Sequence, residues 1–236
     1  MTLTQRAAAE AVGTGFLVAA VIGSGIAASR LSPDDVGLQL LENSLATGVV
    51  LAALIVALQP VSAAFNPVIT LLERVLGAIS TRATIVLIAA QLVGGAAGAI
   101  VANLMFGLPP VTVSGQDRGG PGVWLAEIIA TLGLVLIIFA ALRGGRGHHV
   151  GYLVGAYIAG AYWFTSSTSF ANPAVTVART ITDTFAGIAP ASAPGFILAQ
   201  LLGGAAGFVL VRFLYPTLLP ATATSAAEAA NRKVLS

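Results

Sequence analysis

The sequence predicts an all-α membrane protein with six transmembrane helices, two re-entrant half-helices and an inverted tandem repeat. Three observations predict this fold: six long apolar stretches, two short segments that each contain Asn-Pro, and motifs that recur in both halves of the chain. Of the 236 residues, 57% are hydrophobic and only 8% are charged, whereas soluble domains carry roughly 25% charged residues. Residues 1–236 are therefore predicted to form a single membrane domain.

Six stretches are long enough to cross the hydrocarbon core, which needs about 20 apolar residues. We expect spanning helices at 7–29, 40–59, 82–106, 123–142, 150–168 and 194–215. Two further segments, 60–77 and 170–182, are too short or too polar to span but too apolar for exposed loops. Asparagine favours the N-cap and proline the first helical turn, so each Asn-Pro predicts the start of a short helix.

An internal repeat relates the two halves of the chain. Three motifs recur in the same order in both halves, at a spacing that chance would rarely produce. The matching segments are Ala9-Glu10 with Ala126-Glu127, 65–70 with 171–176, and 90–98 with 199–207. The repeats cover about 7–106 and 123–215 and leave 216–236 as a tail. Because each repeat holds three spans, the second must enter the membrane inverted relative to the first.

The two Asn-Pro segments carry the functional prediction. Non-helical backbone at membrane depth is tolerated only where it is buried in protein or lines a watery cavity, so two re-entrant half-helices imply a pore. If their N-termini meet near the midplane, two helix dipoles and the amides of Asn66 and Asn172 point into one constriction. Cations and protons are thereby disfavoured. An ordinary turn would explain one copy of the motif, but not two copies in inverted repeats.

The distribution of basic residues predicts the orientation. An even number of spans places both termini on one side of the membrane, and the side richer in Lys and Arg faces the cytoplasm. That side carries Arg6, Arg74, Arg82, Arg143, Arg146, Arg212, Arg232 and Lys233, and the other side carries Arg30, Arg118 and Arg179. We expect a multi-pass protein of the inner (plasma) membrane with both termini and the 216–236 tail in the cytoplasm.

Two carboxylates, Glu10 and Glu127, occupy matching positions inside apolar spans. A charge there costs at least about 2.5 to 3.5 kcal/mol, so each should face the interior and bind polar partners. A proton relay is one possible role. We favour a scaffold role, in which each carboxylate accepts hydrogen bonds from the neighbouring re-entrant backbone, with Gln91 and Gln200 sharing that task.

Other ionisable residues suggest less specific roles. Glu73 and Arg179 each follow an Asn-Pro asparagine by seven residues and are expected to be solvated residues at the two mouths. His148 and His149 could form a pH gate or a metal site, but beside Arg143 and Arg146 a basic loop is the preferred interpretation.

Several function classes are excluded by composition. The chain has no cysteine, which rules out thiolate nucleophiles and cysteine-ligated metals. The basic residues are scattered and form no stripe for nucleic acid. Neither a metal-ligand cluster nor a nucleophile with a nearby base is present, so we expect no enzyme, no metal and no cofactor.

The paired Asn-Pro motifs, the repeated anchors and the order of spans resemble the major intrinsic proteins, the aquaporin and aquaglyceroporin family, over nearly the whole chain. The resemblance implies an aquaporin-like right-handed bundle with one pore per subunit, assembled as a homotetramer in the lipid bilayer. The pore-orifice residues that it implies are Asn66, Pro67, Val68, Asn172, Pro173 and Ala174.

The resemblance also implies a narrow filter outside the orifice. Counting without gaps from the two asparagines places it at Ala46, Gly160, Ser169 and Val175. Val175 stands where the family normally has an arginine, so we expect a wide filter without a fixed positive charge. The first motif departs as well, with Val68 in place of the usual alanine and Ala64 where many members have histidine.

The predicted function is passive conduction of small uncharged solutes: glycerol-like polyols, urea, metalloid hydroxides such as arsenite, and water. A bacterial aquaglyceroporin branch associated with arsenic resistance looks similar. The alternative is a secondary transporter with a midplane site between inverted repeats. It would need an ionisable coupling residue at that site, whereas Glu10, Glu127 and Glu42 occupy span ends or scaffold positions.

Overall fold

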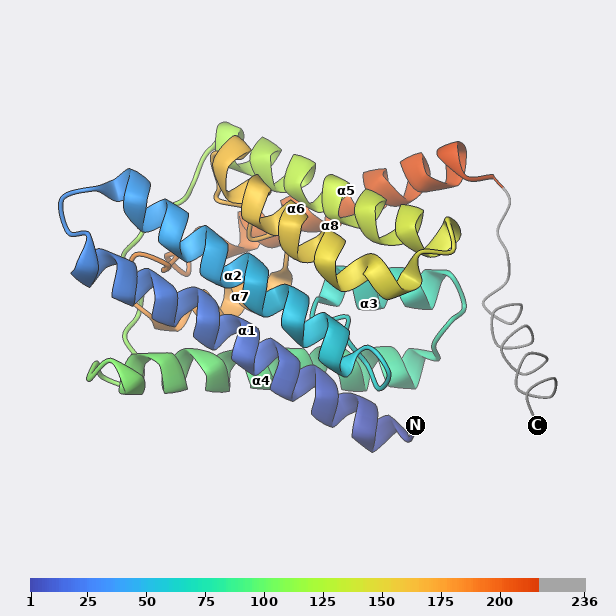
Figure 1. Ribbon diagram of the computed structural model, residues 1–236, viewed down its shortest axis with the longest axis horizontal. Helices are drawn as coiled ribbons and strands as arrows, with labels where there is room; N and C mark the ends of the chain where they lie inside the picture. Colours follow the sequence, from blue (N-terminus) through green and yellow to red (C-terminus); the bar gives the residue numbers. More distant parts are fainter. Residues whose placement is uncertain (217–236) are drawn as a thin grey trace.

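A computed structural model describes residues 1–216 as an all-helical bundle (Figure 1). The α-helices are α1 (Leu3–Leu31), α2 (Val36–Leu58), α3 (Pro67–Val75), α4 (Thr81–Met105), α5 (Pro121–Arg143), α6 (Val150–Phe164), α7 (Pro173–Ala178) and α8 (Ala193–Leu214), with 3-10 turns at Gly147–His149 and Arg179–Ile181. Apart from Pro216, the predicted tail at 216–236 lies outside the described residues.

The predicted fold of six spanning helices and two half-helices is confirmed. Five helices, α1, α2, α4, α5 and α8, have the length and hydropathy of membrane spans. The sixth, α6, has 15 residues and rises about 22 Å. It ends at Phe164 instead of residue 168, because the polar segment that follows turns back towards the centre of the bundle. There the Thr165 hydroxyl donates to the Ala161 carbonyl at 2.6 Å.

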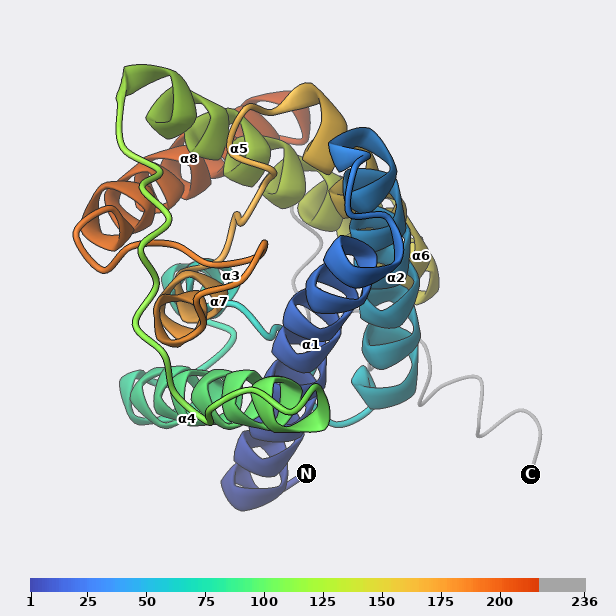
Figure 2. The ribbon, with the colours of Figure 1, turned by 90° about the vertical axis from the view of Figure 1, so that its left-hand side faces the viewer.

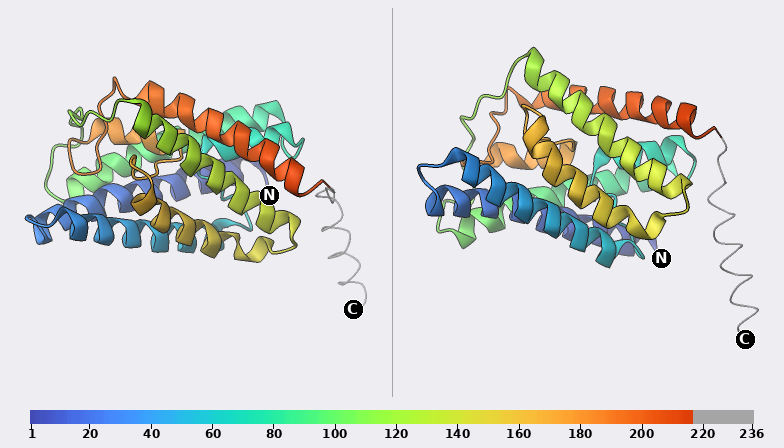
Figure 3. Two further views of the ribbon diagram at one scale, coloured as in Figure 1. Left: turned by 90° about the horizontal axis from the view of Figure 1, so that it is seen from above. Right: turned by 45° about the horizontal axis from the view of Figure 1, so that its top comes forward.

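The two halves of the chain pack in the same way. Helix α1 lies against α4 in the first half as α5 lies against α8 in the second, and α2 packs beside α6 across the halves (Figure 3). The short helices α3 and α7 lie end to end between α4 and α8, so that they overlap when the bundle is viewed along its length (Figures 1 and 2). Together they form a broken seventh element of the bundle.

We call the end of the bundle where α1 begins and α8 ends the terminal end, and the other the distal end. Helix α3 runs from the middle towards the terminal end, and α7 runs from the middle towards the distal end (Figure 1). The half-helices therefore enter from opposite ends, as the inverted repeat predicts.

Glycines in the repeated motif allow the closest helix contacts. A Cβ atom added to Gly94 of α4 would lie 2.1 Å from the carbonyl oxygen of Ala11, and one added to Gly203 of α8 would lie 2.4 Å from that of Ile128. Real Cβ atoms do not approach oxygen so closely. The repeat of segment 90–98 at 199–207 therefore encodes the two equivalent helix crossings.

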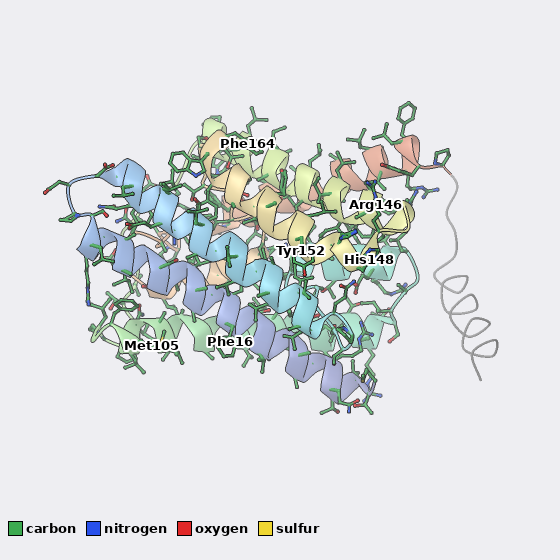
Figure 4. The ribbon with its side chains drawn as sticks, in the orientation of Figure 1. Phe16, Met105, Arg146, His148, Tyr152 and Phe164 are labelled. Atoms are coloured by element: carbon green, nitrogen blue, oxygen red, sulfur yellow. The ribbon has the colours of Figure 1, made fainter. Side chains whose placement is uncertain are left out.

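The outer surface of the bundle is apolar. Phe16, Met105, Tyr152 and Phe164 are 60% to 63% exposed and point away from the bundle (Figure 4). A large exposed apolar surface is unusual for a soluble monomer and typical of helices that face lipid. The chain is therefore a multi-pass membrane protein.

A candidate pore between two half-helices

Each half-helix begins at an Asn-Pro pair, as the sequence predicts. The side-chain oxygen of Asn66 accepts the Val68 backbone N–H at 3.0 Å, and that of Asn172 accepts the Ala174 N–H at 3.0 Å. Proline occupies the first turn of each helix, where its missing N–H leaves no bond unmade. Both asparagines have extended backbone, as N-caps do.

The two asparagines also hold the half-helices together. The Asn66 amide nitrogen donates to the Ala171 carbonyl at 2.7 Å, and the Asn172 amide nitrogen donates to the Phe65 carbonyl at 2.7 Å. Phe65 and Ala171 both have a φ of 47°, a left-handed conformation that is uncommon outside glycine. Each amide nitrogen carries two hydrogens, so one donor per asparagine remains for a ligand between the half-helices.

A buried carboxylate supports the loop before α3. Glu10 is fully buried and accepts hydrogen bonds from the Ser62 hydroxyl at 2.6 Å, the Ala64 N–H at 2.9 Å and the Phe65 N–H at 2.7 Å. The amide of Gln91 donates to it at 2.8 Å. These bonds satisfy backbone donors that the irregular loop would otherwise leave unpaired.

The second half repeats this arrangement before α7. Glu127 is fully buried and accepts the Phe170 and Ala171 N–H groups at 2.8 Å each, and the Gln200 amide donates to it at 2.7 Å. Carboxylate oxygens occupied in this way are poorly placed to exchange protons with a pore. The geometry therefore favours the scaffold role over a proton relay.

A cavity of about 330 Å³ passes between the half-helices and the surrounding spans. It reaches Gln59 and Glu73 towards the terminal end, passes Asn66 and Asn172, and reaches Arg179 towards the distal end. Its walls are stripes with a spacing of four residues, which share one helix face. They are Leu17 and Val21 on α1, Thr47, Leu51 and Ile55 on α2 with Gln59 at its C-cap, Leu134, Ile138 and Leu142 on α5, and Val150, Val154, Ile158 and Tyr162 on α6.

Two of the four predicted filter positions lie outside the cavity wall. Ser169 and Val175 line the cavity, but Ala46 does not, and Gly160 is exposed on the outer side of α6. Thr47 and Tyr162 face the cavity instead. One residue turns a helix by about 100°, so a gapless count that errs by one or two positions selects the wrong face.

Thr47 and Tyr162 form a polar pair in an apolar wall. The Tyr162 hydroxyl lies 3.3 Å from the Thr47 hydroxyl, and both residues are buried. The Ser169 hydroxyl is also buried and has no hydrogen-bond partner among the described residues. An unpartnered buried hydroxyl costs about 1 to 3 kcal/mol, which a bound solute or water would offset.

The substituted residue of the first motif does not shape the cavity. Val68 is buried and packs against Gly204 of α8, where an added Cβ would lie 2.4 Å from its Cγ1 atom. Valine at position 68 therefore packs against α8 and stays out of the cavity wall, whereas Ala64 does line the cavity. Pro67, Pro173 and Ala174 are buried among the helix starts and are likewise not in the cavity wall.

The prediction of a solvated Arg179 is wrong. Only 2% of its surface is exposed, and its Nε donates to the Ala186 carbonyl while its guanidinium lies 3.4 Å from the centre of the Phe170 ring. Arg118, in the α4–α5 connection, lies over the same ring at 5.3 Å. Burial lowers the pKa of Arg118 from its usual value. Glu73 is half-buried and lines the opposite end of the cavity near Arg6.

The two histidines do not line the cavity and lie in the turn before α6, where Figure 4 labels His148. The ring centres of His148 and His149 are 4.0 Å apart. In the part of the chain that the structure describes, no group of three or more His, Asp or Glu side chains could hold a metal ion.

Two polar residues of the cavity wall, Thr47 and Tyr162, were not predicted from the sequence, and Arg179 was expected in solvent. The spacing of wall residues carries a signal for Tyr162 and for Arg179. Tyr162 continues the four-residue stripe of Val154 and Ile158, and Arg179 follows Val175 by the four residues that complete one helical turn. The spacing of wall residues would have located them better than counting from the asparagines.

Comparison with known proteins agrees with this architecture. The sequence profile of the major intrinsic proteins matches residues 1–165. The chain is 47% identical to aquaglyceroporin AqpS of Rhizobium meliloti (strain 1021) over 229 residues, 97% of each protein. It is 33% identical to the lens fiber major intrinsic protein of Lithobates pipiens over 198 residues, which cover 74% of this chain and 70% of that protein.

A solved structure shares the fold. The aquaglyceroporin of Plasmodium falciparum superposes with a TM-score of 0.69 at 18% identity and covers 90% of this chain and 95% of its own. From the profile match and the two sequence relatives together, the chain belongs to the major intrinsic protein family.

Proposed function

We propose that this channel protein conducts small uncharged solutes passively: glycerol-like polyols, urea, metalloid hydroxides such as arsenious acid, and water. The observation that carries the proposal is the cavity of about 330 Å³ that passes both asparagines. Its apolar walls with a few fixed polar groups suit solutes that present both CH and OH groups. The name of the relative AqpS, an aquaglyceroporin, supports the same solute class.

The proposed orifice is formed by Asn66 and Asn172, each with one amide hydrogen available to a passing oxygen. The proposed filter consists of Thr47, Tyr162 and Ser169, which offer hydroxyls, and Val175, which is apolar. Glu10 and Glu127 hold the re-entrant loops in place. Arsenious acid is neutral at pH 7 and resembles a small polyol in size and hydroxyl pattern, which is why it belongs in the solute class.

A passive channel fits the cavity better than an ion-coupled transporter. A transporter would place an ionisable coupling residue beside the substrate near the midplane. Among the described residues, the Arg and Glu side chains in the cavity wall are Arg6, Glu73 and Arg179, and they lie towards its two ends. The middle of the cavity presents amides and hydroxyls.

The arrangement in the cell is also part of the proposal. In the described residues, six arginines lie at the terminal end: Arg6, Arg74, Arg82, Arg143, Arg146 and Arg212. The distal end carries Arg30, Arg118 and Arg179. This bias supports an inner-membrane protein with cytoplasmic termini. Membership of the family supports a homotetramer with one pore in each subunit.

Stopped-flow light scattering on proteoliposomes tests the function. With no ion gradient imposed, glycerol, urea and arsenious acid are each expected to enter at least about tenfold faster than into protein-free vesicles, which is a barrier lowered by about 1.4 kcal/mol. Sucrose, a disaccharide much larger than glycerol, serves as the control solute that is expected to be excluded. Entry no faster than into protein-free vesicles, with correctly assembled protein, would contradict the proposal.

A further inference from the structure

We propose that Arg179 supplies the positive charge of the filter from one helical turn beyond Val175, and that it excludes cations from the otherwise wide pore. This inference rests on the proposed channel function and deepens it. The absence of arginine at position 175 had suggested a filter with no fixed charge. The structure instead brings a different arginine to the same wall of the cavity.

Position and contacts fix where the charge lies. Val175 and Arg179 are four residues apart on one face of α7 and the turn that continues it, and both line the cavity. The Arg179 Nε donates to the Ala186 carbonyl, and the guanidinium plane is held against the Phe170 ring at 3.4 Å. The side chain is therefore anchored in one orientation.

The outer nitrogens of this guanidinium are left for a ligand. Among the described residues, neither terminal nitrogen of Arg179 donates a hydrogen bond, although the residue is only 2% exposed. Neither terminal nitrogen is among the fully buried polar atoms that lack a hydrogen-bond partner, so each keeps some accessible surface. These donors therefore open onto the cavity, where acceptor oxygens of a solute can reach them.

Among the described residues, no carboxylate forms a hydrogen bond or an ion pair with Arg179. Asp183 accepts the Gly115 N–H, and Asp117 accepts the Ser192 hydroxyl and the Gly119 N–H. Glu127 is occupied by backbone and glutamine donors, so its negative charge acts on Arg179 and Arg118 through space and not through a direct contact.

A second arginine beside Phe170 adds to the positive charge. Arg118 lies over the same Phe170 ring and donates to the carbonyls of Gly187 and Phe185 at 2.8 and 3.1 Å. Arg118 does not line the cavity itself. Among the described residues, the distal constriction thus holds two arginines that donate to carbonyls, against the one buried carboxylate of Glu127. The excess positive charge repels cations and attracts acceptor oxygens.

Sodium leak and glycerol flux, measured on the same proteoliposomes, test the inference. A sodium-sensitive fluorophore reports the leak in wild type, Arg179→Met, Arg179→Lys and Ser169→Asp. The last variant leaves Arg179 intact but adds a carboxylate to the same wall, and aspartate tolerates the left-handed backbone of residue 169. Arg30→Met is the matched control, because Arg30 lies at the same end of the bundle but outside the cavity wall.

We expect sodium leak to rise about 10- to 100-fold in Arg179→Met and in Ser169→Asp, as for loss of one unit charge a few ångströms from the path. Sodium leak should stay at the wild-type level in Arg179→Lys and in Arg30→Met. If Arg179→Met does not assemble, the sodium leak of Ser169→Asp tests the inference in its place. If the variant that assembles, Arg179→Met or Ser169→Asp, shows normal glycerol flux and no rise in sodium leak, the inference is overturned and the channel function remains intact. Absence of glycerol flux in the wild type would instead refute the proposed function.

Discussion

Replacing Val175 with arginine is expected to lower glycerol flux at least about tenfold, because it places a second guanidinium one turn from Arg179 in the same wall of the cavity. Val175 is 5% exposed, so the longer side chain has no route to bulk solvent except along the pore. The added volume narrows the passage. Repulsion between the two like charges pushes the new side chain further into the passage. Water, which is smaller, should be affected less than glycerol.

Stopped-flow measurements of glycerol and water entry check this expectation. Val175→Ile is the matched control, because it adds volume at the same position without adding charge. It should reduce glycerol entry far less than Val175→Arg does. If the arginine variant conducts glycerol as fast as the wild type, residue 175 does not form part of the filter.

Replacing Gly94 with leucine is expected to destabilise the protein by about 4 kcal/mol or more, as severe overpacking does. An added Cβ at Gly94 would lie 2.1 Å from the Ala11 carbonyl oxygen, and backbone cannot yield as a flexible side chain can. Gly98 makes an equally close approach to Gly15. The helices α1 and α4 would have to separate, and the Gln91 bond to Glu10 would be lost with them.

Thermal unfolding in detergent, followed by intrinsic fluorescence, measures this loss. A fall in Tm of about 10 °C or more is expected for Gly94→Leu. Gly160→Leu is the matched control, since nothing lies within 4 Å of an added Cβ there. The control should keep both its Tm and its glycerol flux, because Gly160 faces away from the cavity. Equal destabilisation by the two substitutions would contradict the packing account.

Much of the fold could be predicted from the sequence because lipid imposes simple constraints. Apolar length located the spans, the asparagine caps located the starts of α3 and α7, and the repeated motifs revealed the inverted halves. These features are local in sequence, or repeat at a fixed offset. The same repeats suggested the scaffold positions of Glu10 and Glu127, which the structure places against the re-entrant loops.

The cavity wall was harder to predict, since it depends on helix rotation. Ala46 and its neighbour Thr47 differ by one position but lie on different faces of α2, and only Thr47 contacts the cavity. The polarity of Arg179 suggested solvent exposure. Its burial depends on Phe170 and the Ala186 carbonyl, which the loops bring together from outside the helix. Such contacts are tertiary and leave no periodic signal.

The most direct test of an uncoupled channel is the dependence of glycerol flux on ion gradients. Glycerol entry into proteoliposomes would be measured at symmetric sodium and pH, with an imposed gradient of each ion, and after ionophores dissipate those gradients. A passive pore predicts the same rate in all conditions, set by the glycerol gradient alone. A rate that requires a sodium or proton gradient, and falls to that of protein-free vesicles when it is removed, would contradict the account and establish coupled transport.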